Sequence, residues 1–439
     1  MKNIFFIILL ILASAADTIV KAQSQSITII SGATVIDGTK RSPIKNAVVV
    51  IEGNRIKRVG AQNKIKIPKN AQVIEANGKF VIPGLADMHI HAASERNLLR
   101  MLASGFTTAF SPGGPGLKEF ALLKNLASRD DSKMSRFFGV GPAFTVKDSH
   151  ASAPSYGNIL LESADEARAK VREYKAAGVD AIKLIYEDGG RAGRPTYPIM
   201  KPEIMRAIID EAHKQNLKAY VHALNLKRAK EALEAGADGL VHTVLSERVD
   251  DEFIRLMKRK RAVFVTTHSI MKAFADIGAW MQKLEAADER GIVPPEIYER
   301  FKSPAGVEAF YKSVPKLTQE QMGFIKYNLQ KVRDAGILIV AGTDGGGSSV
   351  PVGASSQTEL VLLVEDGLKP EEALRAATIN AARMIGREKE QGTIEAGKLA
   401  DLVILDADPL ADIRNIRRIN RVIKSGVIYD PAELMRNAK

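Results

Sequence analysis

Short apolar segments alternate with amphipathic helical segments through the middle of the chain, between residues 84 and 387. One helical segment starts near Pro202 and another ends before Gly236, and both residues are typical helix boundaries. The predicted strands are 85–91, 107–110, 137–141, 181–186, 219–222, 239–242, 262–267 and 337–342. Eight strands that alternate with helices predict an α/β fold, a closed (β/α)8 TIM barrel of parallel strands.

Both ends of the chain have a different pattern, with apolar and polar residues alternating between Gly and Asn turns. We expect residues 23–83 and 388–439 to form one β-sandwich domain that flanks a barrel of residues 84–387. The barrel segment exceeds the roughly 250 residues that are typical of the fold. We expect the excess, 269–321, to form a cap over the barrel mouth; a longer peripheral helix pair is the alternative.

The first residues have the pattern of an export signal. Lys2 precedes an apolar run from Ile4 to Ala13, and small residues follow up to Ala22. The run is shorter than the roughly 20 apolar residues of a membrane span. We therefore expect residues 1–22 to be a signal peptide, its removal to leave no stable membrane span, and the protein to be periplasmic or secreted.

Composition restricts the remaining classes. The chain has 439 residues, of which 45% are hydrophobic and 26% charged, and this is a normal globular balance. It has no cysteine, which excludes disulfides and thiolate metal ligands. The net charge of +12 can suit an anionic partner, but no nucleic-acid motif accompanies it. We expect a small-molecule substrate and no nucleic acid, and a homo-oligomer stays open.

The first barrel strand ends in two histidines, His89 and His91. Side chains at i and i+2 of a strand point to the same side, so both imidazoles face one point. Two polar residues on a wet sheet face are the simpler interpretation. The flanking residues are apolar, however, and a shared metal ion relieves the cost of burying unpaired imidazoles.

Further polar residues stand at the ends of other predicted strands, where barrels of this kind have their active sites. His222 ends the fifth strand, His242 ends the sixth, and Asp344 follows the eighth. Lys183 lies within the apolar fourth strand, where a buried ammonium is costly. It could pair with Asp344 or extend to the barrel mouth, or it could be a neutral lysine that reacts with carbon dioxide to form a carbamate.

Taken together, these residues resemble the amidohydrolase superfamily of metal-dependent hydrolases, and within it the prolidase- and carboxypeptidase-like branch. The matching segments are 83–91, Lys183, His222, His242, 342–344 and the tail 392–403. The resemblance implies a centre of two divalent ions, zinc first, with manganese, iron or cobalt as alternatives. It implies that His89, His91 and Asp344 hold one ion, that His222 and His242 hold the other, and that a carboxylated Lys183 bridges them.

The resemblance also implies a reaction. An exported enzyme of this kind would hydrolyse an amide or related C–N bond, in a dipeptide, an N-acyl amino acid or a cyclic amide. A metal-bridging hydroxide would attack, and Asp344 would act as proton shuttle. A mononuclear deaminase or cyclic-amide hydrolase, and an exported binding protein without catalysis, are the alternatives.

Substrate contacts are expected from loops. Tyr186, Arg191 and Arg194 follow the fourth strand, and His268 follows the seventh; each is also compatible with an ordinary loop residue. His150 and His213 are expected to be unrelated to the metal site. Dipeptidases of the branch often carry a tyrosine after the fifth-strand His-Ala, whereas Leu224 stands there in this chain, so other amides and lactones stay open.

Overall fold

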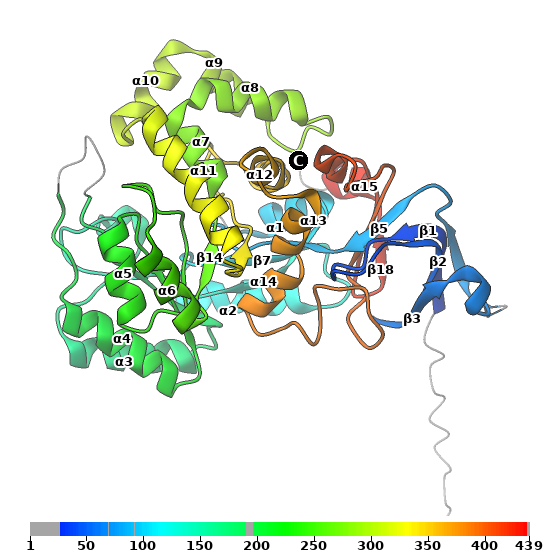
Figure 1. Ribbon diagram of the computed structural model, residues 1–439, viewed down its shortest axis with the longest axis horizontal. Coiled ribbons are helices and arrows are strands. Elements are labelled where there is room, and N and C mark those ends of the chain that lie inside the picture. Colours follow the sequence, from blue (N-terminus) through cyan, green and yellow to red (C-terminus); the bar gives the residue numbers. More distant parts are fainter. Residues whose placement is uncertain (1–26, 69, 92, 190–195, 437–439) are drawn as a thin grey trace, which may run out of the picture.

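The computed structural model describes residues 27–68, 70–91, 93–189 and 196–436 (Figure 1). The expected signal peptide, residues 1–22, lies outside these residues. Within them, no helix has the length and the apolar character that crossing a membrane requires. The strands of this described part form three sheets: a mixed sheet of eight strands, a long parallel sheet of seven and a short parallel sheet of three.

The mixed sheet is built from both ends of the chain. Its strands are β1 (Ile27–Val35), β2 (Ile44–Glu52), β3 (Arg55–Ala61), β4 (Gln72–Glu75), β5 (Phe80–Pro83), β16 (Leu402–Leu405), β17 (Ile419–Lys424) and β18 (Val427–Tyr429). β5 pairs with β1 on one side and with β16 on the other. One apolar cluster contains Val49 and Ile51 of β2 together with Leu402 and Ile404 of β16. The strands expected in a sandwich thus form one hydrogen-bonded sheet around a shared core.

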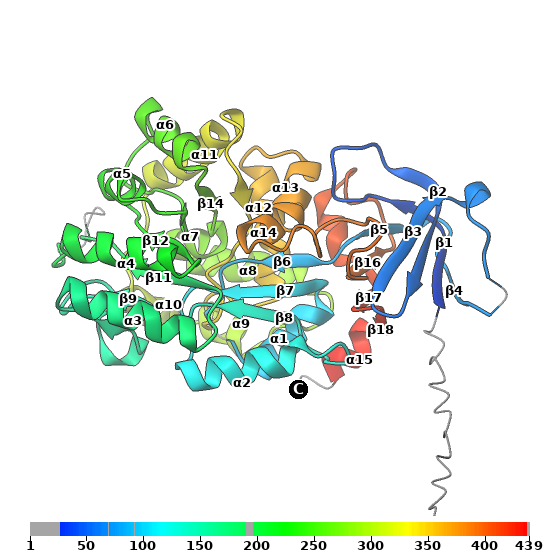
Figure 2. The same cartoon turned by 90° about the horizontal axis from the view of Figure 1, so that it is seen from below.

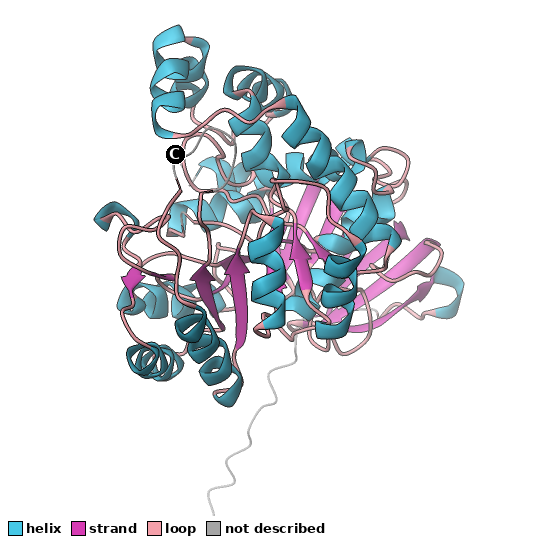
Figure 3. Ribbon diagram, turned by 60° about the vertical axis from the view of Figure 1, so that its left-hand side comes forward, coloured by secondary structure: helices cyan, strands magenta, loops and turns pink. Residues whose placement is uncertain are grey.

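The two parallel sheets carry the strands expected in the middle of the chain. The short sheet contains β6 (Leu85–Asp87), β7 (Phe106–Ser111) and β8 (Arg136–Gly139); the long sheet contains β10 (Ile159–Leu160), β9 (Phe144–Thr145), β11 (Ala181–Ile185), β12 (Lys218–His222), β13 (Gly239–Leu240), β14 (Val263–Val265) and β15 (Ile339–Val340). Each of the eight predicted strands overlaps one of these, and the observed strands are mostly shorter. Figure 3 shows the strands with helices packed around them.

Hydrogen bonds join the two parallel sheets beside both edge strands of the short sheet, β6 and β8. Next to β6, the amide of Met88 donates to the carbonyl of Ala341 beyond β15, at 3.0 Å. Ile90 and Gly345 form an isolated parallel bridge nearby. At the other edge, the amide of Asp180 before β11 donates to the carbonyl of Gly139 in β8, at 2.9 Å. The residues that follow β6 and β15 are therefore held side by side.

Helices cover the parallel strands, and the mixed sheet lies at one end of the molecule (Figure 2). The helices are α1 (Glu95–Ala103), α2 (Leu117–Ser128), α3 (Ala164–Ala176), α4 (Pro202–Lys214), α5 (Leu226–Glu234), α6 (Asp251–Lys260), α7 (His268–Ala275), α8 (Ile277–Ala287), α9 (Pro295–Lys302), α10 (Pro304–Ser313), α11 (Gln319–Asp334), α12 (Ala354–Glu365), α13 (Pro370–Ala376), α14 (Ile379–Met384) and α15 (Pro431–Arg436). The segment expected to form a cap supplies α7 to α10, and α8 to α10 lie together on one side of the molecule (Figure 1). Every residue of α12 from Ala354 to Leu363 is buried, so this helix lies inside the protein and its polar side chains face other protein groups.

Candidate metal centre

A cavity of about 970 Å³ opens where the parallel strands end. Five of the six metal ligands proposed from the sequence line it, from five different segments: His91, Lys183, His222, His242 and Asp344. The sixth, His89, is completely buried directly behind His91 and Asp344. The strand ends therefore bring together all six residues, as the sequence pattern predicts.

The two histidines after β6 and the aspartate after β15 converge on one point. Nε2 of His89 lies 3.1 Å from Nε2 of His91. Oδ1 of Asp344 lies 3.4 Å from the first nitrogen and 3.1 Å from the second. Nδ1 of His91 lies 2.9 Å from the carbonyl oxygen of Gly113, which can only accept, so Nδ1 carries the hydrogen. Nε2 of His91 is then the ring nitrogen that faces Asp344.

His222 and His242 complete the group from the neighbouring strands. The two rings are 4.4 Å apart, and the ring of His242 is 4.6 Å from that of His89. One ligand atom each from His89, His242 and Asp344 lie within 4.8 Å of one another. By the resemblance, His89 and Asp344 would bind one ion and His242 the other. The ligand atoms for both ions thus lie in one compact group.

Burial controls the charge of these groups. It lowers the pKa of His89 and of His242 well below the usual value, and the charges of Lys183 and of the neighbouring histidines lower it further. Both imidazoles are therefore neutral at pH 7, which is the form that binds metal. Burial also lowers the pKa of Lys183 to about 8, although the charge of Asp344 opposes this shift.

This donor set fits a zinc-type cation. Neutral imidazole nitrogens and carboxylate oxygen are its common ligands in proteins without thiolates. Nε2 of His89 and Nε2 of His91 lie 3.1 Å apart, close enough to share a proton or to bind one cation. A divalent ion at this point would be coordinated by His89, His91 and Asp344.

The loop that carries Asp344 is held by a buried carboxylate, that of Asp87. Asp87 accepts hydrogen bonds from the amide and the hydroxyl of Thr343, at 3.1 and 2.7 Å, from the amide of His89, at 3.2 Å, and from the hydroxyl of Ser356 on α12, at 2.7 Å. Burial raises the pKa of Asp87 to about 7 despite these bonds. Asp344 itself has a left-handed backbone, with φ of 60°, which is uncommon outside glycine. The contacts of Asp87 thus fix a strained turn that presents the carboxylate of Asp344 to the cavity.

Of the four substrate contacts predicted from the sequence, the two that the structure describes, Tyr186 and His268, do not line the cavity. Tyr186 is buried, and its hydroxyl donates to Glu231 at 2.8 Å. His268 is fully buried at the start of α7, with Nδ1 2.8 Å from Asp366. Glu231 of α5 holds the first residue, and Asp366, directly after α12, holds the second. Arg191 and Arg194 lie outside the described residues.

His150, which was expected to be unrelated to the site, is part of it, and that prediction was wrong. Its ring stacks on that of His222, at 4.9 Å between centroids, and it lines the cavity. Tyr197 lines the cavity next to it, with the two rings 6.0 Å apart. His213 lies away from the cavity, on α4, paired with Asp238 at 2.8 Å. The residues before His150 carry no strand or helix pattern, so the sequence gives no sign that this loop returns to the fifth strand.

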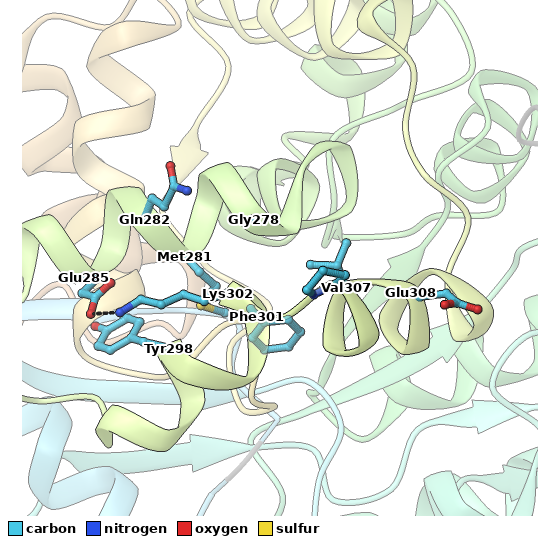
Figure 4. Close-up of a pocket in the computed structure, with 10 residues that line it drawn as sticks. Gly278, Met281, Gln282, Glu285, Tyr298, Phe301, Lys302, Val307 and Glu308 are labelled. Carbon is cyan, nitrogen blue, oxygen red and sulfur yellow. Dashed lines mark hydrogen bonds and ion pairs between the residues drawn. The ribbon is translucent and has the colours of Figure 1, made fainter.

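A second cavity, of about 510 Å³, lies among helices α8, α9 and α10 (Figure 4). Met281, Phe301 and Val307 provide apolar lining, and Lys302 forms an ion pair with Glu285 at 2.8 Å. None of its lining residues is a histidine. The metal-binding chemistry of the described residues is therefore concentrated in the first cavity.

Comparisons with known proteins agree with this geometry. Ochratoxinase of Aspergillus niger is 25% identical over 462 aligned residues, which cover 94% of this chain and 88% of that protein. Imidazolonepropionase of Brevibacillus brevis is 23% identical, over 88% of this chain and 91% of that protein. Among solved structures, a putative prolidase from Bifidobacterium longum superimposes with a TM-score of 0.74 and 28% identity, over 94% of this chain and 99% of that one.

The match to a family profile covers most of the chain. Residues 80–429 match the amidohydrolase family, and this range includes every one of the six converging residues. The chain therefore belongs to the amidohydrolase family, and it is a hydrolase of amide and related carbon–nitrogen bonds.

Proposed function

We propose that the protein is an exported amidohydrolase with a two-metal centre, which hydrolyses amides whose acyl or amine part is bulky and apolar. In this proposal the eight strands β6, β7, β8, β11, β12, β13, β14 and β15 close into a barrel, and α7 to α10 cap its mouth. The hydrogen bonds beside both edge strands of the short sheet, to β15 and β11 of the long sheet, support the closure. The signal-like pattern of residues 1–22 supports export to the periplasm or medium.

The observation that carries this proposal is the environment of Lys183. Its side chain is only 3% exposed, lines the cavity with four other candidate ligands, and has its pKa lowered to about 8. A lysine that is substantially neutral near pH 8 can add carbon dioxide and lose a proton, which gives a carbamate with two oxygens. These oxygens would bridge one ion held by His89, His91 and Asp344 and another held by His222 and His242.

When bound, the ions would acidify a water molecule and polarise the scissile carbonyl. Asp344 faces the cavity from its fixed turn, so its carboxylate can accept the proton of the attacking water and deliver it to the leaving nitrogen. The water oxygen then becomes part of the carboxylic acid product, and the amine leaves with the proton. His150 stacks on His222, and Tyr197 lies next to His150 in the cavity wall, where their polar atoms can contact the substrate.

The wall of the cavity supports the substrate class. Met271 and Phe274 of α7, and Tyr311 of α10, face the metal side from the expected cap. The hydroxyl of Tyr311 accepts a hydrogen bond from the amide of Ile277, at 3.0 Å. Tyr311 therefore offers its aromatic ring, not its hydroxyl, as cavity wall. Leu224 adds apolar surface at the position where dipeptidases of the branch often have tyrosine. A volume of about 970 Å³ accepts a ligand much larger than a simple dipeptide.

Relatives give a starting set of substrates. Ochratoxinase is named for ochratoxin, and a similar solved structure is that of a Xaa-Pro dipeptidase, with a TM-score of 0.72 and 24% identity. We propose to assay the zinc- or manganese-loaded protein against N-acyl amino acids with small or aromatic acyl groups, Xaa-Pro dipeptides, cyclic amides and lactones. Hydrolysis of aromatic N-acyl amino acids with two metal ions per chain is expected. One ion per chain and no effect of bicarbonate would instead favour a mononuclear enzyme.

A further inference from the structure

A buried glutamate of α12, Glu359, has no part in the reaction described above. Its side chain is 1% exposed and accepts four hydrogen bonds. Oε1 accepts from the hydroxyl of Thr266, at 2.6 Å, and from the amide of His268, at 2.9 Å. Oε2 accepts from the amide and from the hydroxyl of Ser269, both at 2.7 Å. All four donors belong to the residues on either side of Thr267.

Thr267 is the residue that these contacts enclose. It has φ of 55° and ψ of 39°, the left-handed conformation, which is exceptional for a β-branched residue. The conformation costs roughly 1–2 kcal/mol for residues other than glycine. Thr267 supplies no side-chain cap to α7, and the carboxylate of Glu359 takes that place at the start of the helix. Glu359 thus stabilises a turn that the local sequence disfavours.

The turn has a consequence for the metal centre. Oγ1 of Thr267 lies 3.0 Å from Nδ1 of His242, and both groups are buried. When Nδ1 carries the ring hydrogen and donates it to Oγ1, this bond fixes the rotation of the ring and leaves Nε2 free for a ligand. The amide of Thr267 also donates to the carbonyl of Gly342, at 2.9 Å, in the segment that leads to Asp344.

We propose that Glu359 is a positioning residue of the metal centre: it holds Thr267 in the left-handed conformation from which Oγ1 orients His242. The inference rests on the proposed function in that it requires His242 to bind metal. The backbone strain at Thr267 is then the cost of placing its hydroxyl beside His242, and the hydrogen bonds of Glu359 compensate for that strain. Strained residues that surrounding contacts fix are typical of functional sites.

The test measures metal affinity, by competition with a chromogenic chelator, beside the kcat and KM of the metal-loaded enzyme. Glu359→Gln keeps the size of the side chain but turns an NH2 group toward the donors of Ser269. We expect its metal affinity to fall by about 10- to 100-fold, as for other residues that orient ligands. We expect a lower kcat with little change in KM. Thr267→Ser keeps the hydroxyl and should retain the wild-type affinity, whereas Thr267→Ala should lose affinity as Glu359→Gln does.

Asp366→Asn is the matched control. Asp366 also binds the first turn of α7, through Nδ1 of His268, but within the described part of the chain its carboxylate has no hydrogen bond to Thr267. The Asp366→Asn variant should have a lower melting temperature and an unchanged metal affinity. The double variant Glu359→Gln/Thr267→Ala should bind metal no more weakly than either single variant, because both act through the same hydroxyl.

Two outcomes overturn the inference. One is a folded Glu359→Gln protein that binds metal with wild-type affinity. The other is an additive loss in the double variant. If Glu359→Gln does not fold, the pair Thr267→Ser and Thr267→Ala decides, and equal affinities overturn the inference. A wild-type chain that binds no divalent metal would instead refute the proposed function, so the two failures are distinguishable.

Discussion

The chemistry of Lys183 gives a quantitative prediction. Burial lowers its pKa from 10.5 to about 8, so at pH 7.5 roughly a quarter of the side chain is neutral, compared with about one part in a thousand for an ordinary lysine. Only the neutral amine reacts with carbon dioxide. After metal and carbon dioxide are removed, the rate of reactivation at constant dissolved carbon dioxide should therefore rise with pH and level off above about pH 8. A lysine with an ordinary pKa would show about a tenfold increase per pH unit up to pH 10.

The assay follows hydrolysis after addition of ¹³C-bicarbonate and zinc, with the carbamate detected as a ¹³C resonance. Lys183→Met removes the amine and should give neither the resonance nor reactivation, while Lys183→Arg separates the effect of charge from that of the carbamate. A fully active, metal-loaded protein without a carbamate resonance would refute the reasoning. A reactivation rate that still rises tenfold between pH 8 and 9 would show that Lys183 is not perturbed as described.

Three further predictions test separate parts of the site. Asp344→Asn should bind metal but lower kcat by about 10²- to 10⁴-fold, as loss of a proton-transfer group does; kcat close to the wild-type value would exclude Asp344 as the shuttle. Lys183 has a lower pKa in the folded chain than in the unfolded one, so the metal-free protein should gain up to about 3 kcal/mol of stability as pH rises from 8 to 10.5. Denaturant unfolding of Lys183→Met should lack that gain, and an identical pH dependence would contradict it. Gly113→Ala would place a Cβ atom 3.0 Å from Cε1 of His91, so chelator competition should show weaker metal binding, unlike Gly323→Ala, where nothing lies within 4 Å.

The parallel strands and the six converging residues could be predicted because both follow from repeated local patterns. A buried strand of an α/β fold is a short apolar run, and its carboxyl end is where His222, His242 and Asp344 stand in the sequence. The observed strands are mostly shorter because residues such as His89 continue past the hydrogen-bonded ladder into the site. The apolar core could be predicted too, because it consists largely of the same short apolar runs.

The remaining parts depend on contacts between distant segments. His150 reaches the site through a loop without periodicity, and nothing local distinguishes it from an exposed histidine. Glu359 is a charged residue in a helix, which in most proteins faces solvent; only the burial of α12 gives it four donors. His268 and Tyr186 follow strands as substrate contacts would, but Asp366 and Glu231 hold them elsewhere.

The central position of β5 in the mixed sheet has a consequence for how the chain folds. β5 pairs with β16 through Ile82 and Val403, so strands from opposite ends of the sequence are neighbours. Such long-range pairing slows folding, because the loop between the strands must be ordered first. The N-terminal strands cannot complete their sheet until nearly the whole chain has been synthesised. A chain cut off before Leu402 would present β5 as an open edge, ready to pair with other chains.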